Sequence, residues 1–323
     1  MEFDLIECIG RHCALARADV VLGIGDDAAL LAPPAGHELA VSTDTLVDGV
    51  HFVHGTPARD IGWKALAVNL SDLAAMGATP AWALLALTLP HADHAFVDDF
   101  AAGFAELAAP HALALVGGDT TSGPLAIGVT VLGLVPAGQA LRRDGARVGD
   151  VVCVTGTLGD AAAGLRWLDE AVAQREAVDP TSRAALLQRM RRPQPRVAAG
   201  LALRGLASAC IDVSDGLLAD LGHVARRSGV GIEVAADALP ASPALRHACD
   251  GALRVRLQAS GGDDYELAFT AAPERLDAIR HALEAVDCGV SCIGTVVAGS
   301  GVRLLAADGS AIALPSAGWQ HFA

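Results

Sequence analysis

The 323-residue sequence lacks the marks of a secreted or membrane protein. Its seven cysteines show no CxxC spacing, and no basic-then-apolar signal segment opens the chain, which fits a reducing cytoplasm. The strongest apolar run, 81–89, is too short to span a bilayer. We therefore expect a cytoplasmic protein that does not bind membranes, and we interpret the cysteines as buried structural thiols.

The sequence is also poor in clustered positive charge and in the common nucleotide-binding loops. Its net charge is −14, and only 189–196 is locally basic, which argues against a nucleic-acid surface. Neither a GxxxxGK[ST] loop nor a GxGxxG fingerprint occurs, which excludes the common P-loop and Rossmann sites. An acidic protein can still bind polyphosphate through bridging cations.

The length and the alternation of patterns indicate two α/β or α+β domains. We predict domains at 1–137 and 151–323, joined by a linker at 138–150 that is rich in arginine and glycine. Expected strands are 39–42, 82–89, 112–116, 125–135, 151–155, 209–213, 231–234 and 265–270. Expected helices are 60–76, 93–109, 159–171, 196–208 and 216–228.

Six short segments place aspartate beside glycine, serine or threonine, at what we predict to be ends of strands and helices. They are 23–27, 42–44, 71–72, 117–119, 212–215 and 261–264. Any one of them is explained by a turn or a helix cap. Together they suit magnesium, which takes few carboxylates per ion and fills its other positions with water and phosphate. Gly117-Gly118 and Gly261-Gly262 would let backbone N–H groups approach phosphate oxygens.

These motifs, in this order, resemble the thiamine-monophosphate kinase family of the aminoimidazole-ribotide-synthetase-like superfamily. The resemblance spans essentially the whole chain. It rests on GIGDDAALL at 23–31, STDTLVDGVHF at 42–52, KALAVNLSDLAAMGATP at 64–80, GGDTTSGP at 117–124, VTGTLGDAAAGL at 154–165, IDVSDGL at 211–217 and SGGDDYEL at 260–267.

The resemblance implies a two-domain α/β (α+β) fold, with an N-terminal mixed sheet that pairs in a homodimer and a C-terminal α/β domain. ATP would bind at the domain and subunit junction and give its γ-phosphoryl group to thiamine monophosphate, assisted by several Mg²⁺ ions. Implied metal ligands are Asp27, Ser42, Thr43, Asp44, Asp72, Asp119, Asp212 and Asp215. Implied ATP contacts are Gly118, Asp119, Arg143 and Ser214, with Asp44, Asp119 and Arg143 as the catalytic set.

On the acceptor side the resemblance implies contacts from His51, Asp263 and Trp319. Position 263 departs from the family, which usually has glutamate there. His51 has an alternative role as a phosphohistidine nucleophile, and Trp319 has one as a C-terminal anchor. Two other functions stay open: a sister activity of the superfamily, such as aminoimidazole-ribotide or selenophosphate synthesis, and a non-catalytic magnesium–nucleotide binding module.

Overall fold

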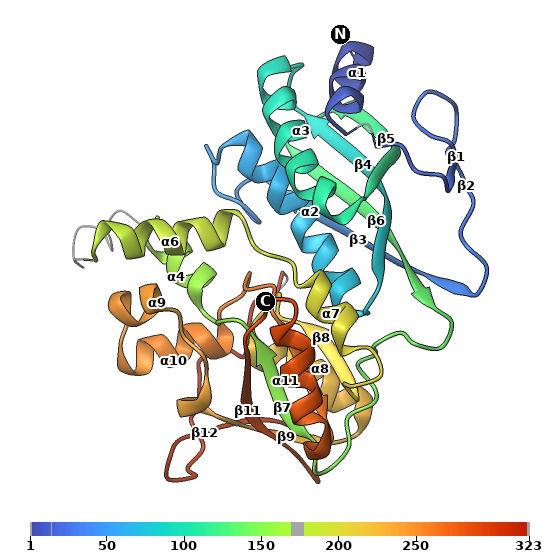
Figure 1. Ribbon diagram of the computed structural model, residues 1–323. Helices are drawn as coiled ribbons and strands as arrows, with labels where there is room; N and C mark the ends of the chain where they lie inside the picture. The colour runs from blue at the N-terminus through green and yellow to red at the C-terminus, as the bar shows by residue number, and fades with distance from the viewer. Residues whose placement is uncertain (1, 14, 169–177, 322–323) are drawn as a thin grey trace. The chain divides into compact units, whose positions relative to one another are not determined.

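The structure, a computed structural model, describes residues 2–13, 15–168 and 178–321 and divides into two compact units. Unit 1 holds the residues up to 73 together with 78–140, and unit 2 holds 74–77 together with 141–323 (Figure 1). The predicted linker at 138–150 and the autonomy of the two predicted domains stay predictions.

Unit 1 is built on a four-stranded mixed sheet of order β3-β6-β4-β5. Only the β4–β5 pair is parallel. A two-stranded ribbon, β1-β2, accompanies it. In chain order the elements are α1 (Glu2–Cys13), β1 (Val20–Leu22), β2 (Leu30–Leu31), β3 (His37–Val47), α2 (Ala58–Ala75), β4 (Thr79–Leu89), α3 (His94–Ala108), the 3₁₀ turn η1 (Ala109–His111), β5 (Ala114–Ser122) and β6 (Ala126–Pro136).

Helix α2 is buried nearly all round, and this positions the polar side chains that follow. Leu66, Leu70 and Leu73 are at most 1% exposed, and Asn69 is also fully buried. Glycines allow the close approach of α3: a Cβ on Gly62 would lie 2.0 Å from the carbonyl oxygen of Phe100. This contact fixes α2 against α3.

Unit 2 contains a six-stranded mixed sheet of order β12-β9-β11-β7-β10-β8, in which only β12–β9 is parallel. Its strands are β7 (Val151–Thr155), β8 (Ala209–Asp212), β9 (Gly231–Ala235), β10 (Leu267–Ala271), β11 (Val290–Val297) and β12 (Gly301–Leu305). Its helices are α4 (Asp160–Arg166), α6 (Pro180–Arg191), α7 (Val197–Leu203), α8 (Leu217–Ser228), α9 (Pro243–Ala248), α10 (Gly251–Ser260) and α11 (Leu276–Glu284), with 3₁₀ turns η2 (Ala236–Ala238) and η3 (Pro273–Arg275).

Several predicted boundaries were wrong, for local backbone reasons. Strand β5 starts at Ala114 because Ala112 is left-handed, with φ of 49°. Helix α7 ends at Leu203, shortly before Gly205 turns the chain with φ of 72°. Strand β3 runs to Val47 rather than ending at 42. The predicted 159–171 helix ends at Arg166, and 169–171 lies outside the described residues.

The thiol prediction was wrong at one position. Six cysteines are buried, but Cys292 is exposed. It lies opposite Cys153 in the β7–β11 ladder, with the two Sγ atoms 3.3 Å apart. Among the described helices, none has the length and apolar character needed to cross a bilayer.

Candidate active site

The first group of predicted ligands lies between β3 and α2. The Ser42 hydroxyl donates a short hydrogen bond to the Asp72 carboxylate. One residue pair further along, the backbone N–H of Asp44 donates to Oδ1 of Asn69 at 3.1 Å, and the Asn69 amide donates to the Ala65 carbonyl. These bonds join β3 to α2 at the point where the Ser42 hydroxyl and the carboxylates of Asp44 and Asp72 lie. Hydroxyl and carboxylate oxygens are hard donors.

The pleat of β3 places Thr43 on the other side of the strand from Ser42 and Asp44. Asp44 shares its row across the sheet with Val129 and Leu85, which are buried under the helices. Thr43 shares its row with Thr130, whose hydroxyl donates to the Thr43 hydroxyl at 3.0 Å, and with the exposed Leu84. The predicted ligands of β3 therefore lie on two different faces of the sheet.

His51 lies in the turn after β3 and is held by its neighbours. Its Nδ1 accepts the backbone N–H of Val47 at 2.9 Å, and its carbonyl accepts the buried Lys64 ammonium at 3.0 Å. Because Nδ1 is used as an acceptor, the ring is oriented by the backbone. This geometry supports a hydrogen-bonding role for His51.

Asp119 and Gly118 lie on β5, at the opposite edge of the sheet from β3. A Cβ on Gly118 would lie 1.9 Å from the Leu85 carbonyl oxygen, so glycine is needed for this strand approach. Asp119 pairs with Ala86 and shares the open face with Thr45. Three strand steps of about 4.8 Å separate the two edges by roughly 14 Å, so Asp119 and Asp44 of one unit cannot bind the same ion.

Asp27 lies in the segment that connects β1 to β2. Its backbone N–H donates to the Asp26 carboxylate at 2.8 Å, so Asp26 closes this turn as a local acceptor. Both residues are exposed. The contacts here give Asp26 a turn role and leave the predicted ligand role to Asp27.

In unit 2 the predicted ligands follow strand β8. Asp212 is its last residue and is buried, and Ser214 and Asp215 follow in the loop before α8. The buried carboxylate of Asp220 accepts backbone N–H bonds from Ser214, Asp215 and Gly216 at 3.1–3.2 Å. Burial raises the pKa of Asp220 to about 7, although these bonds lower it. Asp220 fixes the loop, although the aspartate motifs of the sequence did not include it.

Asp263 is held against the same loop in a strained conformation. Its φ is 68° and that of Tyr265 is 50°, in a region disfavoured for side chains other than glycine. The Asp263 N–H donates to the Ser214 carbonyl, the Tyr265 N–H donates to Val213, and the Tyr265 hydroxyl donates to the Asp263 carboxylate at 3.0 Å. Unit 2 thus brings Ser214 and Asp263 together.

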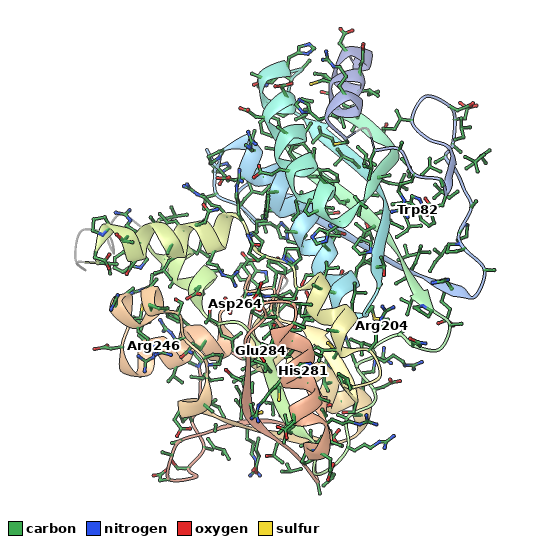
Figure 2. The ribbon with its side chains drawn as sticks, viewed as in Figure 1. Trp82, Arg204, Arg246, Asp264, His281 and Glu284 are labelled. Carbon is green, nitrogen blue, oxygen red and sulfur yellow. The ribbon has the colours of Figure 1, made fainter. Side chains whose placement is uncertain are left out.

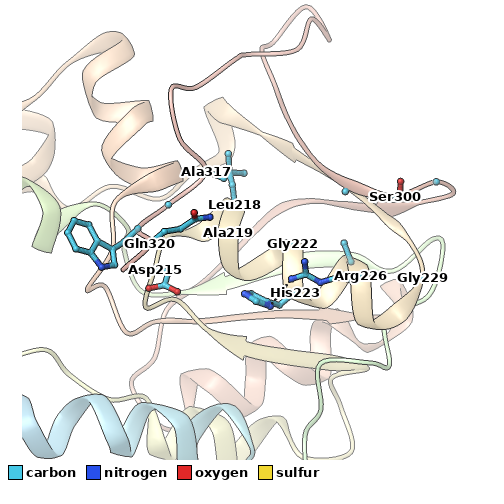
Figure 3. A pocket seen from close by; sticks show the side chains of 15 residues that line it. Asp215, Leu218, Ala219, Gly222, His223, Arg226, Gly229, Ser300, Ala317 and Gln320 are labelled. Atoms are coloured by element: carbon cyan, nitrogen blue, oxygen red, sulfur yellow. Dashed lines mark hydrogen bonds between the residues drawn. The ribbon is translucent and has the colours of Figure 1, made fainter. Parts of the chain in front are cut away.

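Trp319 belongs to the same group. Its backbone N–H donates to the Asp215 carbonyl at 2.9 Å, yet the residue is 57% exposed. It lines a cavity of about 820 Å³ that runs along α8, with Asp215 and Gln320 at one end and Gly229 and Ser300 at the other (Figure 3). The backbone is anchored while the indole stays accessible, so anchoring and ligand contact are compatible.

Arg143 lies beside β8 and α8. Its carbonyl accepts the Ser228 hydroxyl at 3.1 Å, and its charge lowers the pKa of His223 together with burial and the nearby Arg226. Arg143 and Ser214 both belong to unit 2.

A second acidic group in the GGDDYEL segment is structural. Glu266 is fully buried, receives hydrogen bonds from Arg189, Arg196 and Thr155, and leaves no room for a side chain at Gly156. Asp264 (labelled in Figure 2) is buried beside it and accepts the Gly159 N–H, and burial raises its pKa well above the usual range. These acids hold the strand and loop that carry Asp263.

The prediction that the six aspartate segments lie at the ends of strands and helices was wrong for several of them. Ser42 and Asp44 are inside β3, Asp72 is inside α2, and Asp119 is inside β5. Asp212 is at a strand end as predicted.

Comparison with sequence families agrees with the two-unit architecture. Residues 25–135 match the family described as AIR synthase related protein, N-terminal domain, and residues 147–306 match AIR synthase related protein, C-terminal domain. A solved structure of E. coli HypE, a hydrogenase maturation protein, shares the fold at 23% identity, with a TM-score of 0.76 over 97% of this chain and 96% of that one. The fold and site thus define an AIR synthase related protein.

Relatives that match over the full length are more specific. The thiamine-monophosphate kinase of Salmonella typhimurium is 45% identical, covering 100% of this chain and 98% of the relative. The crystal structure of thiamine-monophosphate kinase from Stenotrophomonas maltophilia is 51% identical, with a TM-score of 0.88 over 96% and 98% of the two chains. AaThiL complexed with AMPPCP and TMP is 35% identical, with a TM-score of 0.79 over 99% and 97%. The chain belongs to the thiamine-monophosphate kinase family.

Proposed function

We propose that this chain transfers the γ-phosphoryl group of ATP to thiamine monophosphate, giving ADP and thiamine diphosphate. The observation that carries the proposal is the full-length likeness to AaThiL complexed with AMPPCP and TMP. It is supported by the hydroxyl of Ser42 and the carboxylate of Asp72 in unit 1, and by the aspartates of the Asp212–Asp215 loop in unit 2. ATP and reduced thiols both fit a cytoplasmic location, which stays a prediction.

Magnesium fits these residues because their donors are hard oxygens. We propose ligands at Asp27, Ser42, Thr43, Asp44, Asp72 and Asp119 of unit 1 and at Asp212 and Asp215 of unit 2. Bound Mg²⁺ would supply charge neutralisation between the two phosphates. Proposed ATP contacts are Gly118, Asp119, Arg143 and Ser214, with Asp44, Asp119 and Arg143 acting on the transferred group.

Direct in-line transfer needs no dedicated base. The second pKa of a phosphate monoester is near 6, so the acceptor oxygen is already largely anionic at neutral pH. The protein's task is alignment and charge stabilisation. We propose His51 as an acceptor contact, with its ring oriented by the Val47 N–H at Nδ1, and direct transfer requires no phosphohistidine step.

We propose a homodimer in which the open face of the unit 1 sheet is covered by a second copy. This face exposes apolar side chains: Val41 is 61%, Leu39 is 47% and Leu84 is 38% exposed. Asp119 lies on this face, while Asp44 lies on the helix-covered face at the other edge. In such a dimer, Asp119 of each copy would lie in the covered interface.

We propose that the acceptor binds at the Asp215 end of the cavity along α8, where the exposed indole of Trp319 can stack on an aromatic ring. Asp263 approaches the same loop and would contact the acceptor with a carboxylate one methylene shorter than in the family. Replacing Trp319→Ala should raise the KM for thiamine monophosphate about tenfold or more and leave the ATP KM within about twofold. An equal rise in both constants would contradict stacking.

Coupled measurement of ADP release tests the activity. The proposal expects release that depends on thiamine monophosphate and yields thiamine diphosphate in equal amount. Release without an acceptor, or none with one, would refute it, and binding of ATP without turnover would favour a magnesium–nucleotide module. Turnover with aminoimidazole-ribotide precursors or selenide would identify a sister enzyme.

A further inference from the structure

The first helix carries a polar cluster that the proposed kinase site does not use. Cys8 and His12 are four residues apart on α1, so they lie on one face of the helix. That face packs on α3, which contributes Asp98. The Cys8 thiol donates to Oδ1 of Asp98 at 3.4 Å, and Nε2 of His12 lies 2.8 Å from the same oxygen.

The geometry argues against a nucleophilic triad. A cysteine nucleophile needs an imidazole as its base, with the carboxylate behind the imidazole. Here the thiol and the imidazole both meet the carboxylate, so the imidazole is not placed to take the thiol proton. The three groups instead converge: one sulfur, one nitrogen and one oxygen atom lie within 4.8 Å of one another.

We propose that Cys8, His12 and Asp98 form a binding site for a divalent transition metal of the Zn²⁺ class. Zinc takes cysteine sulfur, histidine nitrogen and carboxylate oxygen at about 2.0–2.3 Å, which puts tetrahedral ligands roughly 3.5 Å apart. Small rotations of these side chains reach that spacing. Binding releases the thiol proton, and the ion takes the place of the hydrogens now shared with Asp98.

The site differs in chemistry from the proposed magnesium site, because magnesium prefers oxygen donors and avoids thiolate. Cys8 is 4% exposed, whereas the side chains of His12 and Asp98 are 32% and 61% exposed, so an ion can enter from solvent and keep a water ligand. Arg11 also reaches Cys8 and opposes a cation. We expect Arg11 to move aside when the ion binds. The bound ion would then link α1 to α3.

Cobalt reports this site directly, since sulfur-to-cobalt charge transfer requires a thiolate ligand. We would titrate the full chain with Co²⁺ in excess Mg²⁺, which occupies the oxygen sites. One equivalent should produce the charge-transfer band, and Zn²⁺ should abolish it. Cys8→Ser should remove the band, and His12→Gln and Asp98→Asn, which alter partly exposed side chains, should weaken Co²⁺ binding at least tenfold.

Two cysteine variants serve as controls. Cys13→Ser changes a buried thiol on the same helix, and Cys292→Ser changes the exposed thiol of unit 2; both should keep the band. Zn²⁺ should raise the melting temperature of the wild type but not of His12→Gln, a readout that does not depend on kinase activity. Absence of the band in the wild type, or its survival in Cys8→Ser, would overturn the proposal and leave an ordinary hydrogen-bonded contact between helices.

Discussion

Neighbouring residues with the same side chain have different roles in this protein. Asp26 accepts the N–H of Asp27, Asp264 is buried beside Glu266, and Asp220 fixes the loop that holds Asp215. In each case hydrogen-bond partners and burial separate a structural carboxylate from a candidate ligand. The sequence alone does not make this distinction, because it gives neither the burial nor the hydrogen-bond partners of each carboxylate.

The Asp26–Asp27 pair offers a matched test. Asp27→Asn removes a proposed ligand charge and should lower kcat/KM by about 100-fold or more, a typical loss for one electrostatic contact in the transition state. Asp26→Asn keeps an oxygen that accepts the Asp27 N–H, and it should change kcat/KM by less than about fivefold. Steady-state kinetics over a Mg²⁺ titration would measure both, and equal losses would contradict the assignment.

His111, in the turn η1, should make stability depend on pH. Burial lowers its pKa below the usual 6.5, because desolvation disfavours the charged ring. The unfolded chain therefore takes up the proton more readily, and stability present above about pH 6.5 is lost as the pH falls. Melting curves from pH 7.5 to 5.5 should fall less steeply for His111→Gln than for the wild type. His91→Gln, which removes an exposed ring, is the control and should keep the wild-type slope.

At the scale of elements, periodicity predicted the four strands of the unit 1 sheet, but it missed β11 and β12 of the unit 2 sheet and misplaced several ends. Strand β3 continues through Ser42 and Asp44 because its alternate residues face the helices, and a polar strand interior looks like a loop in sequence. The strain at Asp263 and Tyr265 depends on contacts with Val213 and Ser214, some fifty positions away in the sequence. Such contacts are set by the tertiary fold, so local patterns could not predict them.

Asn69 joins two elements and gives a prediction at this scale. Asn69 is fully buried, and Asn69→Ala would remove the acceptor of the part-buried Asp44 N–H. We expect a loss of about 1–3 kcal/mol in the free energy of unfolding, measured by urea denaturation. Thr130→Ala, on the open face of the same sheet, should cost about 0.5 kcal/mol or less. Similar costs for the two variants would argue against a joining role for Asn69.

For the whole molecule, the central expectation is that activity requires two copies. The ligand positions of unit 1 lie at opposite edges and on opposite faces of one sheet, and its open face exposes Val41. A charge at that position should be tolerated in an isolated unit but not in a covered interface. Assembly and catalysis should therefore be lost together.

Val41→Glu tests this directly. Analytical ultracentrifugation should show a monomer, and kcat/KM should fall at least about 100-fold while circular dichroism stays unchanged. Val148→Glu places the same charge on a valine of unit 2 that is 62% exposed and should leave both assembly and rate unaltered. A fully active monomer, or a dimer that persists in Val41→Glu, would refute the expectation that activity requires this interface.

The alternation along β3 also limits how this protein can change in length during evolution. Substitutions can alter either face separately, but deleting one residue before Thr43 would turn Ser42 and Asp44 toward the open face and Val41 toward the helices. Metal binding and assembly would fail in one event, and no second mutation nearby could restore only one of them. We therefore expect insertions and deletions among natural relatives to avoid 37–47 and to accumulate in the connecting loops.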